Sequence, residues 1–267
     1  MKKLTALLLA LTIVLALAAC GSKSDDDWAA VEEAGVLKVG ITYYEPMNYI
    51  DDNGELTGFE TEFTTAVCEK LGVTPEFVEI NWDSKVMELE SKTIDCIWNG
   101  MTITEDRLAA MSISDPYVKN AQVIVVKADS AYASTADLVD ATLVAEVGSA
   151  GEAQIEGEEA NADLAQAEYV GMNKQTDCLM EVKAGTADAA VLDWTLAKSM
   201  VGEGTDFADL KMMEGVELAT EEYGIAFRQG SDFTAKVDEA VKALVADGTL
   251  PALAEKYGLA LAPAIAG

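Results

Sequence analysis

TLVAEVGSAGEAQIEGEEA, at residues 142–160, decides the fold class of this chain. Its first part is a short apolar run typical of a buried strand, and its second part follows a Ser-Ala-Gly turn and predicts a helix. The same order of strand and helix recurs in AEYVGM and NKQTDCLMEVKAGT (167–186) and in ADAAVLD and WTLAKSMVG (187–202). Strands that alternate with helices indicate an open α/β sheet with parallel strand pairs.

Another block of alternating strands and helices lies nearer the N-terminus. VLKVGI (36–41), TPEFVEI (74–80) and TIDCIW (93–98) are expected to be strands, with helices at 59–72 and 84–92. AQVIVVKA (121–128) is strongly β-like, STADLVD (134–140) predicts a capped helix, and EEYGIAFRQG (221–230) predicts a last strand before two closing helices.

The order of these blocks predicts two lobes joined by two hinge-crossing strands. We expect lobe 1 to be discontinuous, with residues 35–122 plus 224–262, and lobe 2 to comprise residues 123–223. In open α/β sheets, ligands bind beyond the carboxyl ends of the strands. Both ligand-binding edges would then face one cleft, which hinge closure could seal.

The first residues predict a secretion signal rather than part of the fold. MKK is a positive start, an apolar run follows, and LAAC (17–20) stands before Gly21. This order resembles the lipobox of bacterial lipoproteins, which implies a signal peptide at 1–19, a diacylglycerol on Cys20 and a lipidated tether at 20–34. An uncleaved membrane anchor stays open as an alternative, although the apolar run is short for a spanning helix.

The charge balance excludes several classes of partner. The chain has 47 acidic and 18 basic residues, no histidine, and a formal net charge of −29, which becomes −31 when the signal takes Lys2 and Lys3 with it. Nucleic acid and anionic lipid both require a basic surface. Cys68, Cys96 and Cys178 lack the paired spacing of a zinc site, so we expect no metal and no cofactor. Buried free thiols are the default reading, and a Cys68–Cys96 disulfide stays open.

The segment NGMTITEDR (99–107) follows the predicted strand TIDCIW and carries one of the two arginines in the sequence. Gly100 permits close approach of the backbone to a ligand, and Thr102 adds a hydroxyl. Arg107 can direct its planar guanidinium to the same point and bind a carboxylate with two parallel hydrogen bonds. A surface arginine paired with a nearby acid is the alternative.

The second block offers complementary groups at its own strand ends. In VGSAGEA (147–153), backbone N–H groups at a helix start favour an anion, although an ordinary capped helix would look the same. Asp193 ends a buried strand and either caps the next helix or binds a cation. Tyr44 and Trp82 follow strands of the first block and lie either in the core or on the wall of the cleft.

The chain resembles the family 3 extracellular solute-binding proteins, which serve polar amino-acid ABC transporters. The matching segments are GVLKVGITYYEPMNYIDDNGELTGFETEF, NGMTITEDR with SISDPY, VGSAGE, GTADAAVLD and EEYGIAFRQGSDF, in family order over nearly the whole chain after the signal. The resemblance implies an α/β, two-lobed periplasmic-binding-protein-like fold of type II. Two departures are Ala150, where the family usually has threonine, and Met47, where it has phenylalanine.

The resemblance also implies a role for each site residue. Arg107 and Thr102 would hold the α-carboxylate of an amino acid, and Ser149 and the N–H of Ala150 would close on it from lobe 2. Asp193 would bind the α-ammonium with help from the backbone of Gly100, and Tyr44 and Trp82 would surround the ligand stem. Glu146, Asn99 and Glu60 are expected near the mouth of the site, where extra carboxylates would favour a cationic or amide side chain. Glu146 and Glu60 as solvated acids are an equal alternative.

We therefore expect a monomeric receptor that is anchored outside the bacterial cell membrane through Cys20. It would bind a polar or basic amino acid by hinge closure and deliver it to an ABC permease. An enzyme would need an acid or base in the cleft, and Glu146 is the single candidate, without a partner. A sensor module is the third class considered, but no signalling domain is recognisable in the sequence.

Overall fold

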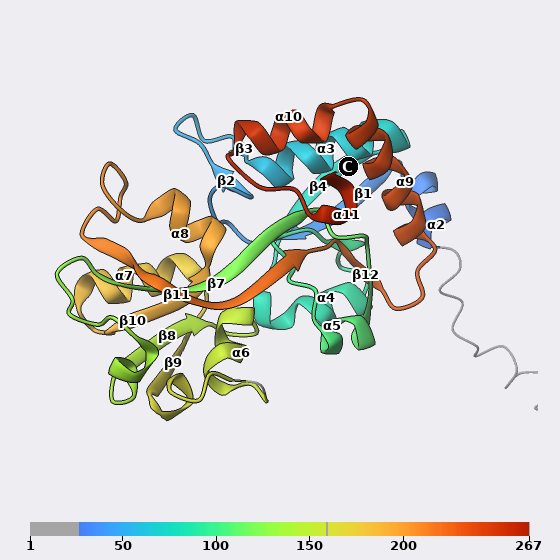
Figure 1. Ribbon diagram of the computed structural model, residues 1–267. Helices are drawn as coiled ribbons and strands as arrows, with labels where there is room; N and C mark the ends of the chain where they lie inside the picture. The colour runs from blue at the N-terminus through green and yellow to red at the C-terminus, as the bar shows by residue number, and fades with distance from the viewer. Residues whose placement is uncertain (1–26, 159, 267) are drawn as a thin grey trace, which may run out of the picture.

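The computed structural model describes residues 27–158 and 160–266, which we call the described chain. Residues 1–19, the expected signal peptide, and Cys20, the expected lipidation site, lie outside it. The described chain contains two five-stranded sheets with helices packed on them, and Figure 1 shows them as two lobes. The predicted two-lobed α/β architecture is confirmed.

The sheet of lobe 1 has the strand order β4-β1-β5-β12-β6. Strand β1 (Val36–Ile41) pairs in parallel with β4 (Thr74–Glu79) and β5 (Cys96–Ile97), and β12 (Ala226–Arg228) runs antiparallel between β5 and β6 (Met111–Ile113). The other elements of this lobe are α2 (Asp27–Ala34), β2 (Tyr49–Ile50), β3 (Leu56–Thr57), α3 (Phe59–Leu71), η1 (Trp82–Ser84), α4 (Lys85–Glu90), α5 (Glu105–Ala110), α9 (Phe233–Ala246), α10 (Thr249–Lys256) and α11 (Pro263–Ala266).

The sheet of lobe 2 has the order β11-β7-β10-β8-β9. Strand β8 (Thr142–Glu146) pairs in parallel with β9 (Glu168–Met172) and β10 (Ala189–Asp193). The other elements are η2 (Thr135–Leu138), α6 (Ala150–Glu156), η3 (Leu164–Gln166), α7 (Gln175–Ala184) and α8 (Trp194–Met200). In each sheet, the first of the three parallel strands lies between the second and the third, so the two lobes share one topology.

Two long antiparallel strands connect the lobes. Strand β7 (Val118–Lys127) pairs with β11 (Leu210–Tyr223), with Val118 opposite Tyr223 and Lys127 opposite Leu210. Figure 1 shows both strands passing from one lobe into the other. Strand β11 begins well before the predicted strand at 221. Its register shifts between Met212 and Glu217, and such an interruption removes the regular alternation by which a strand is predicted.

Part of the expected tether at 20–34 belongs to the folded body. Residues Asp27–Ala34 form helix α2 rather than a linker. The Asp27 carboxylate is buried and lies 2.9 Å from Nε of Arg228, and the ring of Trp28 packs on Phe233 with centroids 5.2 Å apart. Both partners are distant in sequence, so the segment predicted as a tether carries no local indication of this helix.

Two smaller expectations also change. Residues 135–138 form a 3-10 turn rather than an α-helix, held by a capping box between Ser134 and Asp137. The strand expected at 93–98 pairs only at Cys96 and Ile97, because Trp98 packs into the aromatic core and Asn99 and Gly100 turn into the site. Cys68, Cys96 and Cys178 are buried free thiols.

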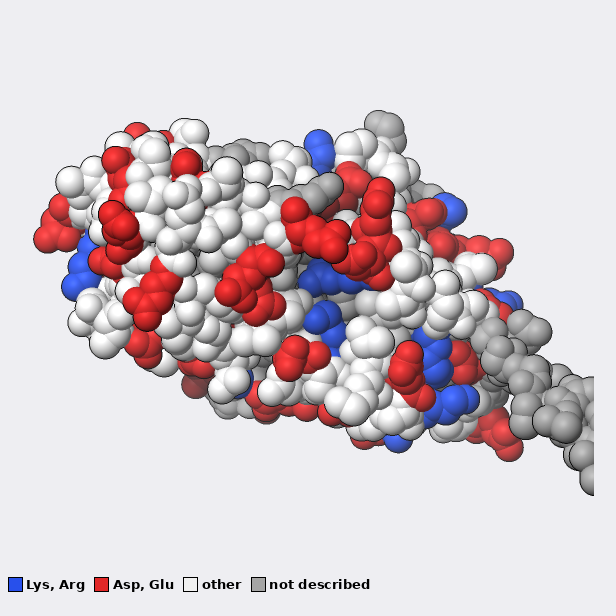
Figure 2. All heavy atoms as spheres, turned by 90° about the horizontal axis from the view of Figure 1, so that it is seen from below, with Lys and Arg blue, Asp and Glu red and all other residues white. Residues whose placement is uncertain are grey.

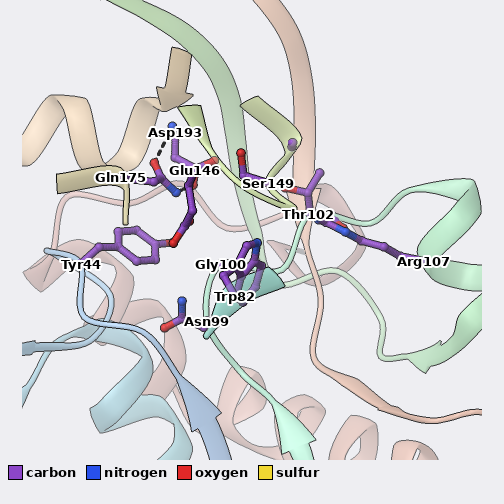
Figure 3. Close-up of a pocket in the computed structure, with 11 residues that line it drawn as sticks. Tyr44, Trp82, Asn99, Gly100, Thr102, Arg107, Glu146, Ser149, Gln175 and Asp193 are labelled. Carbon is purple, nitrogen blue, oxygen red and sulfur yellow. Dashed lines mark hydrogen bonds between the residues drawn. The ribbon is translucent and has the colours of Figure 1, made fainter. Parts of the chain in front are cut away.

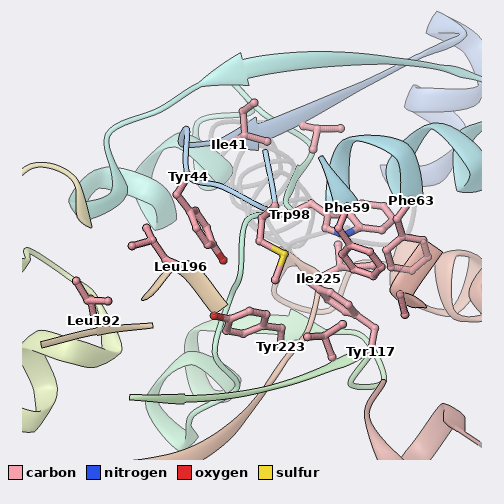
Figure 4. Packing of buried hydrophobic residues seen from close by; sticks show 14 of the residues in the cluster. Ile41, Tyr44, Phe59, Phe63, Trp98, Tyr117, Leu192, Leu196, Tyr223 and Ile225 are labelled. Carbon is pink, nitrogen blue, oxygen red and sulfur yellow. The ribbon is translucent and has the colours of Figure 1, made fainter. Parts of the chain in front are cut away.

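An aromatic cluster lies beneath the junction of the two lobes (Figure 4). The rings of Phe63 and Trp98 meet edge to face at 4.9 Å, and Tyr117 lies 5.5 Å from Phe63 and 6.4 Å from Tyr223. These side chains are essentially inaccessible to water. Packed aromatic pairs of this kind stabilise the core under the cleft beyond the area they bury.

No helix of the described chain combines the length and the apolar character that crossing a bilayer requires.

Candidate functional site

A pocket lies between the two lobes (Figure 3), and ten of the residues predicted for the site line it, whereas Glu60 does not. Its lining consists of Tyr44, Trp82, Asn99, Gly100, Thr102, Arg107, Glu146, Ser149, Ala150, Gln175 and Asp193. The cavity has a volume of about 10 Å³, which admits little more than a water molecule. A larger guest therefore requires the lobes or the lining side chains to move.

The positions of these residues follow from the topology. Tyr44 comes after β1, Trp82 after β4, and Asn99 and Gly100 after β5. On the other side, Glu146 ends β8 and Asp193 ends β10. All five strands are parallel members of their sheets, and their carboxyl ends meet at the pocket, as expected for ligand sites of open α/β sheets.

Gly100 allows the closest approach in the lobe 1 wall. Its φ is +54°, and a β-carbon at this position would lie 1.8 Å from the hydroxyl of Tyr44. Its N–H donates to Oε1 of Glu60 over 2.8 Å. Glycine is needed here for both its backbone conformation and its lack of a side chain.

Glu60 was expected near the mouth of the site, and this is wrong. Its side chain is completely buried behind Gly100, where it accepts hydrogen bonds from the hydroxyl of Tyr117 and the amide of Asn48. Burial raises the pKa of Glu60 to about 7, although these donors oppose the shift. Glu60 therefore holds the Gly100 loop in place and is separated from the pocket by that loop.

Asn99 lines the pocket, and its side chain makes three hydrogen bonds to neighbouring residues. Its Oδ1 accepts from the N–H of Thr42 (2.9 Å) and the amide of Asn48 (3.0 Å), and its Nδ2 donates to the Thr42 hydroxyl (2.6 Å). Asn99 thus fixes the loops after β1 and β5 to each other.

Arg107 sits in the first turn of α5, which the side chain of Thr104 caps by accepting from the N–H of Arg107 over 3.3 Å. Its guanidinium donates to the carbonyl of Thr102 (2.8 Å) in lobe 1 and to the carbonyl of Gly148 (3.1 Å) in lobe 2. Within the described chain no carboxylate lies within 4 Å of it. Burial lowers the pKa of Arg107. A guanidinium has more N–H groups than these two carbonyls use, so it can still receive an anion.

On the lobe 2 side, Ser149 caps α6 by accepting from the N–H of Glu152 over 3.0 Å, and Ala150 is the first residue of that helix. Asp193 is buried, and it does not cap α8 with its side chain. Instead it accepts from the amides of Asn120 (2.7 Å), Gln122 (2.6 Å) and Gln175. Neutral donors hold this carboxylate in position without neutralising it, so it can still attract a cation.

Glu146 is a buried acid whose side chain has no hydrogen-bond partner in the described chain. This side chain is 4% exposed. Burial and then the charge of Asp193 raise the pKa of Glu146 to about 8, with Lys85 opposing the shift. The alternative of a solvated surface acid is wrong for Glu146.

The structure adds residues that the sequence did not single out. Gln175 lines the pocket and donates to Asp193, while Glu221 on β11 accepts from the hydroxyl of Thr102. Lys85 is buried and donates to the carbonyls of Trp82 (3.0 Å) and Gly148 (2.9 Å), which bridges the two lobes. Its ammonium lies 4.7 Å from the Trp82 ring, and burial lowers its pKa to about 8.

Most of the charged side chains on the surface around the cleft are acidic. Figure 2 shows lysine and arginine side chains inside a hollow of this face, with aspartate and glutamate side chains around it. No group of three or more Cys, Asp or Glu side chains in the described chain is arranged to hold a metal ion. The site thus offers charges of both signs to a small organic guest.

Comparison with known proteins identifies the family. The profile of the bacterial extracellular solute-binding proteins, family 3, matches residues 37–260. The chain belongs to this family. As an extracellular solute-binding protein of family 3, it has the type II, periplasmic-binding-protein-like fold that the sequence predicts.

Relatives of this family 3 protein have named ligands. The arginine-binding extracellular protein ArtP of Bacillus subtilis (strain 168) is 30% identical over 260 residues, which cover 96% of this chain and 98% of that protein. The L-cystine-binding protein TcyJ of Escherichia coli (strain K12) is 30% identical over 85% of this chain and 84% of its own length. A mutant of ArgBP from T. maritima has a crystal structure with a TM-score of 0.79 at 32% identity, covering 87% of this chain and 99% of that one.

Proposed function

We propose that this protein binds a free α-amino acid with a cationic side chain, for which L-arginine is the first candidate, between lobes 35–122 plus 224–262 and 123–223. The observation that carries the proposal is that Arg107 of lobe 1 and Asp193 of lobe 2 line the same enclosed pocket. An amino acid presents a carboxylate and an ammonium that must both be met when water is excluded.

The proposed contacts follow the predicted roles. Arg107 and Thr102 hold the carboxylate, together with Ser149 and the N–H of Ala150 at the start of α6. Asp193 holds the ammonium, and Tyr44 and Trp82 enclose the apolar stem. Met47 is fully buried, so it supports this wall from the core.

The preference for a cationic side chain rests on Glu146. This carboxyl lines the pocket, is shielded from water and makes no hydrogen bond in the described chain. A guanidinium would satisfy it with two hydrogen bonds. The arginine-binding relative ArtP is consistent with this choice.

A thermal-shift screen of the twenty amino acids with the purified protein tests the proposal. We expect the largest rise in melting temperature with L-arginine, because its guanidinium can donate two parallel hydrogen bonds to Glu146, and a smaller rise with L-lysine, whose side-chain ammonium cannot. A rise restricted to aspartate or glutamate, or no rise with any amino acid, would refute it.

We propose further that the protein is held outside the cell membrane by a lipid on Cys20 and passes its ligand to an ABC permease as a monomer. Binding without chemistry is the simplest use of the pocket, because the buried Glu146 makes no hydrogen bond to an acid or base of the described chain. Lys85 acts on it as a nearby charge and donates its own hydrogen bonds to the carbonyls of Trp82 and Gly148. Replacement of Cys20 by alanine should release the protein into the medium, and turnover of prephenate or arogenate would argue for an enzyme instead.

A further inference from the structure

Glu221 lies on the hinge strand β11 and connects both lobes to the proposed carboxylate site. Its Oε1 accepts three hydrogen bonds, from the hydroxyl of Thr102 (3.0 Å), from the amide of Asn120 (2.5 Å) and from the amide of Gln122 (2.9 Å). Thr102 belongs to lobe 1, and both amides belong to the other hinge strand, β7. The same two amides donate to Oδ1 of Asp193.

The hydroxyl of Thr102 cannot serve two anions at once. A threonine hydroxyl has a single hydrogen to donate, and in this structure Glu221 receives it. Thr102 can therefore donate to a ligand carboxylate only if Glu221 releases that hydrogen. A protonated Glu221 would do so, because it can donate its own proton to Oγ1 of Thr102 over the same 3.0 Å.

The charges around Glu221 also favour its protonation when a ligand carboxylate binds. Arg107 on α5 is without an ion pair in the described chain, and Glu221 is its strongest charge partner. Asp193 at the end of β10 and Tyr223 on β11 are the other titratable groups that act on Glu221 or respond to its charge. A ligand carboxylate that binds Arg107 replaces Glu221 as its counter-ion and places a second negative charge beside it.

We propose that Glu221 is a positioning residue for the ligand carboxylate: it takes up a proton from solvent when the carboxylate binds, and thereby frees the Thr102 hydroxyl to donate. This inference rests on the proposed function. Burial, and next the charge of Asp193, raise the pKa of Glu221 to about 7, so the proton is available near neutral pH.

The direction of the pH dependence follows from linkage. The ligand carboxylate raises the pKa of Glu221 above its value in the free protein, so the complex holds more protons than the free protein between these two values. Affinity then falls as the pH rises above about 7, by at most about tenfold per pH unit. Below about pH 7 this contribution is constant.

Glu221→Gln tests the proposal with L-arginine as the probe. The glutamine carries N–H donors at every pH, so the contribution of this position no longer titrates. Glu60, Glu146 and Lys85 titrate in the same pH range in both proteins. We therefore divide the dissociation constant of the wild type by that of E221Q, because this ratio cancels the effect of those three groups. Calorimetry from about pH 6 to about pH 9 should show this ratio rising above pH 7, at up to about tenfold per unit.

The neighbouring residue provides a matched control. Glu222 follows Glu221 on the same strand, and its side chain points to the opposite face. Glu222→Gln should keep the pH dependence of the wild type. A ratio that does not change with pH, or that falls as the pH rises, overturns the inference, as does an equal effect of E222Q.

A direct titration keeps the proposal testable if E221Q does not fold. NMR spectra are recorded for protein labelled with ¹³C at the glutamate carboxyl groups. The resonance that is present in the wild type and absent from the Glu221→Asp variant belongs to Glu221. Its titration should move to higher pH when L-arginine saturates the protein, and an unchanged or lower value overturns the inference. If no amino acid binds at any pH, the proposed function itself fails, which is distinguishable from binding without this proton uptake.

Discussion

The two arginines of the chain have opposite structural roles. Arg228 is anchored among protein groups only: it donates to Asp27 (2.9 Å) and to the carbonyls of Leu89 and Ile94. Arg107 reaches two carbonyls at the mouth of the pocket and is without an ion pair in the described chain. A saturated arginine stabilises the fold, whereas one with free donors facing a pocket is available for a ligand.

The same substitution at the two positions should therefore have separate effects. Arg107→Lys keeps the charge but loses the planar fork, so affinity for L-arginine should fall about 10- to 100-fold with little change in the melting temperature of the free protein. Arg107→Ala should cost about 3–5 kcal/mol of binding free energy.

Arg228→Lys is the matched control. It should lower the melting temperature, because the hydrogen bonds that tie α2 and β12 together are lost, and it should leave the affinity of the folded protein unchanged. Calorimetry and thermal denaturation of both variants decide the matter. Near-wild-type affinity of R107K and R107A would refute the assignment of Arg107 as the carboxylate ligand.

Among the elements, the loop between β8 and α6 makes the contact across the cleft. The carbonyl of Gly148 accepts from both Lys85 and Arg107 of lobe 1. Its φ is +75°, and a β-carbon there would lie 3.0 Å from Nζ of Lys85 and 3.3 Å from Cα of Asp83. The loop can approach lobe 1 this closely because the residue has no side chain.

Gly148→Ala should consequently hinder closure. We expect the affinity for L-arginine to fall about tenfold or more, because the added β-carbon would contact Lys85 and Asp83 of the opposite lobe when the lobes close. The left-handed strain of about 1–2 kcal/mol lowers the stability of the variant. Gly204→Ala is the control, since Gly204 has a φ of +87° but open space around its Cα. That variant should lose a similar amount of stability and bind normally. Equal affinities of the two variants would contradict the role of this loop.

The sequence predicted the elements that carry a repeated pattern and missed those that depend on distant partners. The carboxyl ends of parallel strands meet at one edge of a sheet, so the sequence alone predicts that Tyr44, Gly100 and Asp193 lie at one cleft. The roles within that pocket come from the family resemblance and stay proposals.

The missed features have no local signal. Gln175 reads as an ordinary helix start, and nothing in EEYGIAF distinguishes Glu221, which faces the site, from Glu222, which does not. Helix α2 depends on Arg228, about two hundred residues away. Lys85 looked like a solvated helix residue, because lysines are rarely buried.

At the scale of the whole molecule, the formal net charge of −29 coexists with acids buried around one cleft. Glu60, Glu146 and Glu221 all have pKa values raised to about 7 or 8, and desolvation is the largest cause in each case. Burial of several carboxyls of one sign is unfavourable for the ligand-free fold. It is suited to a site that completes its charge balance with a cationic guest.

These buried acids predict how the stability of the free protein depends on pH. Their pKa values are higher in the folded protein than in the unfolded chain, so the folded state holds more protons between about pH 4.5 and about pH 8. Stability must then fall as the pH rises through this window. We expect the melting temperature without ligand to decrease from about pH 5 to about pH 8.

Glu146→Gln should reduce the decrease of melting temperature with pH, because a neutral amide replaces a carboxyl that must ionise in a buried position. Its effect on the free energy of unfolding should be more stabilising at pH 8 than at pH 5, by about 1–3 kcal/mol. Thermal and urea denaturation at the two pH values measure it. Glu168→Gln, at an exposed position on β9 of the same lobe, should leave the slope unchanged. A melting temperature that is constant or rises across this range, or equal flattening by E168Q, would show that the acids around the cleft do not control the stability of the free protein.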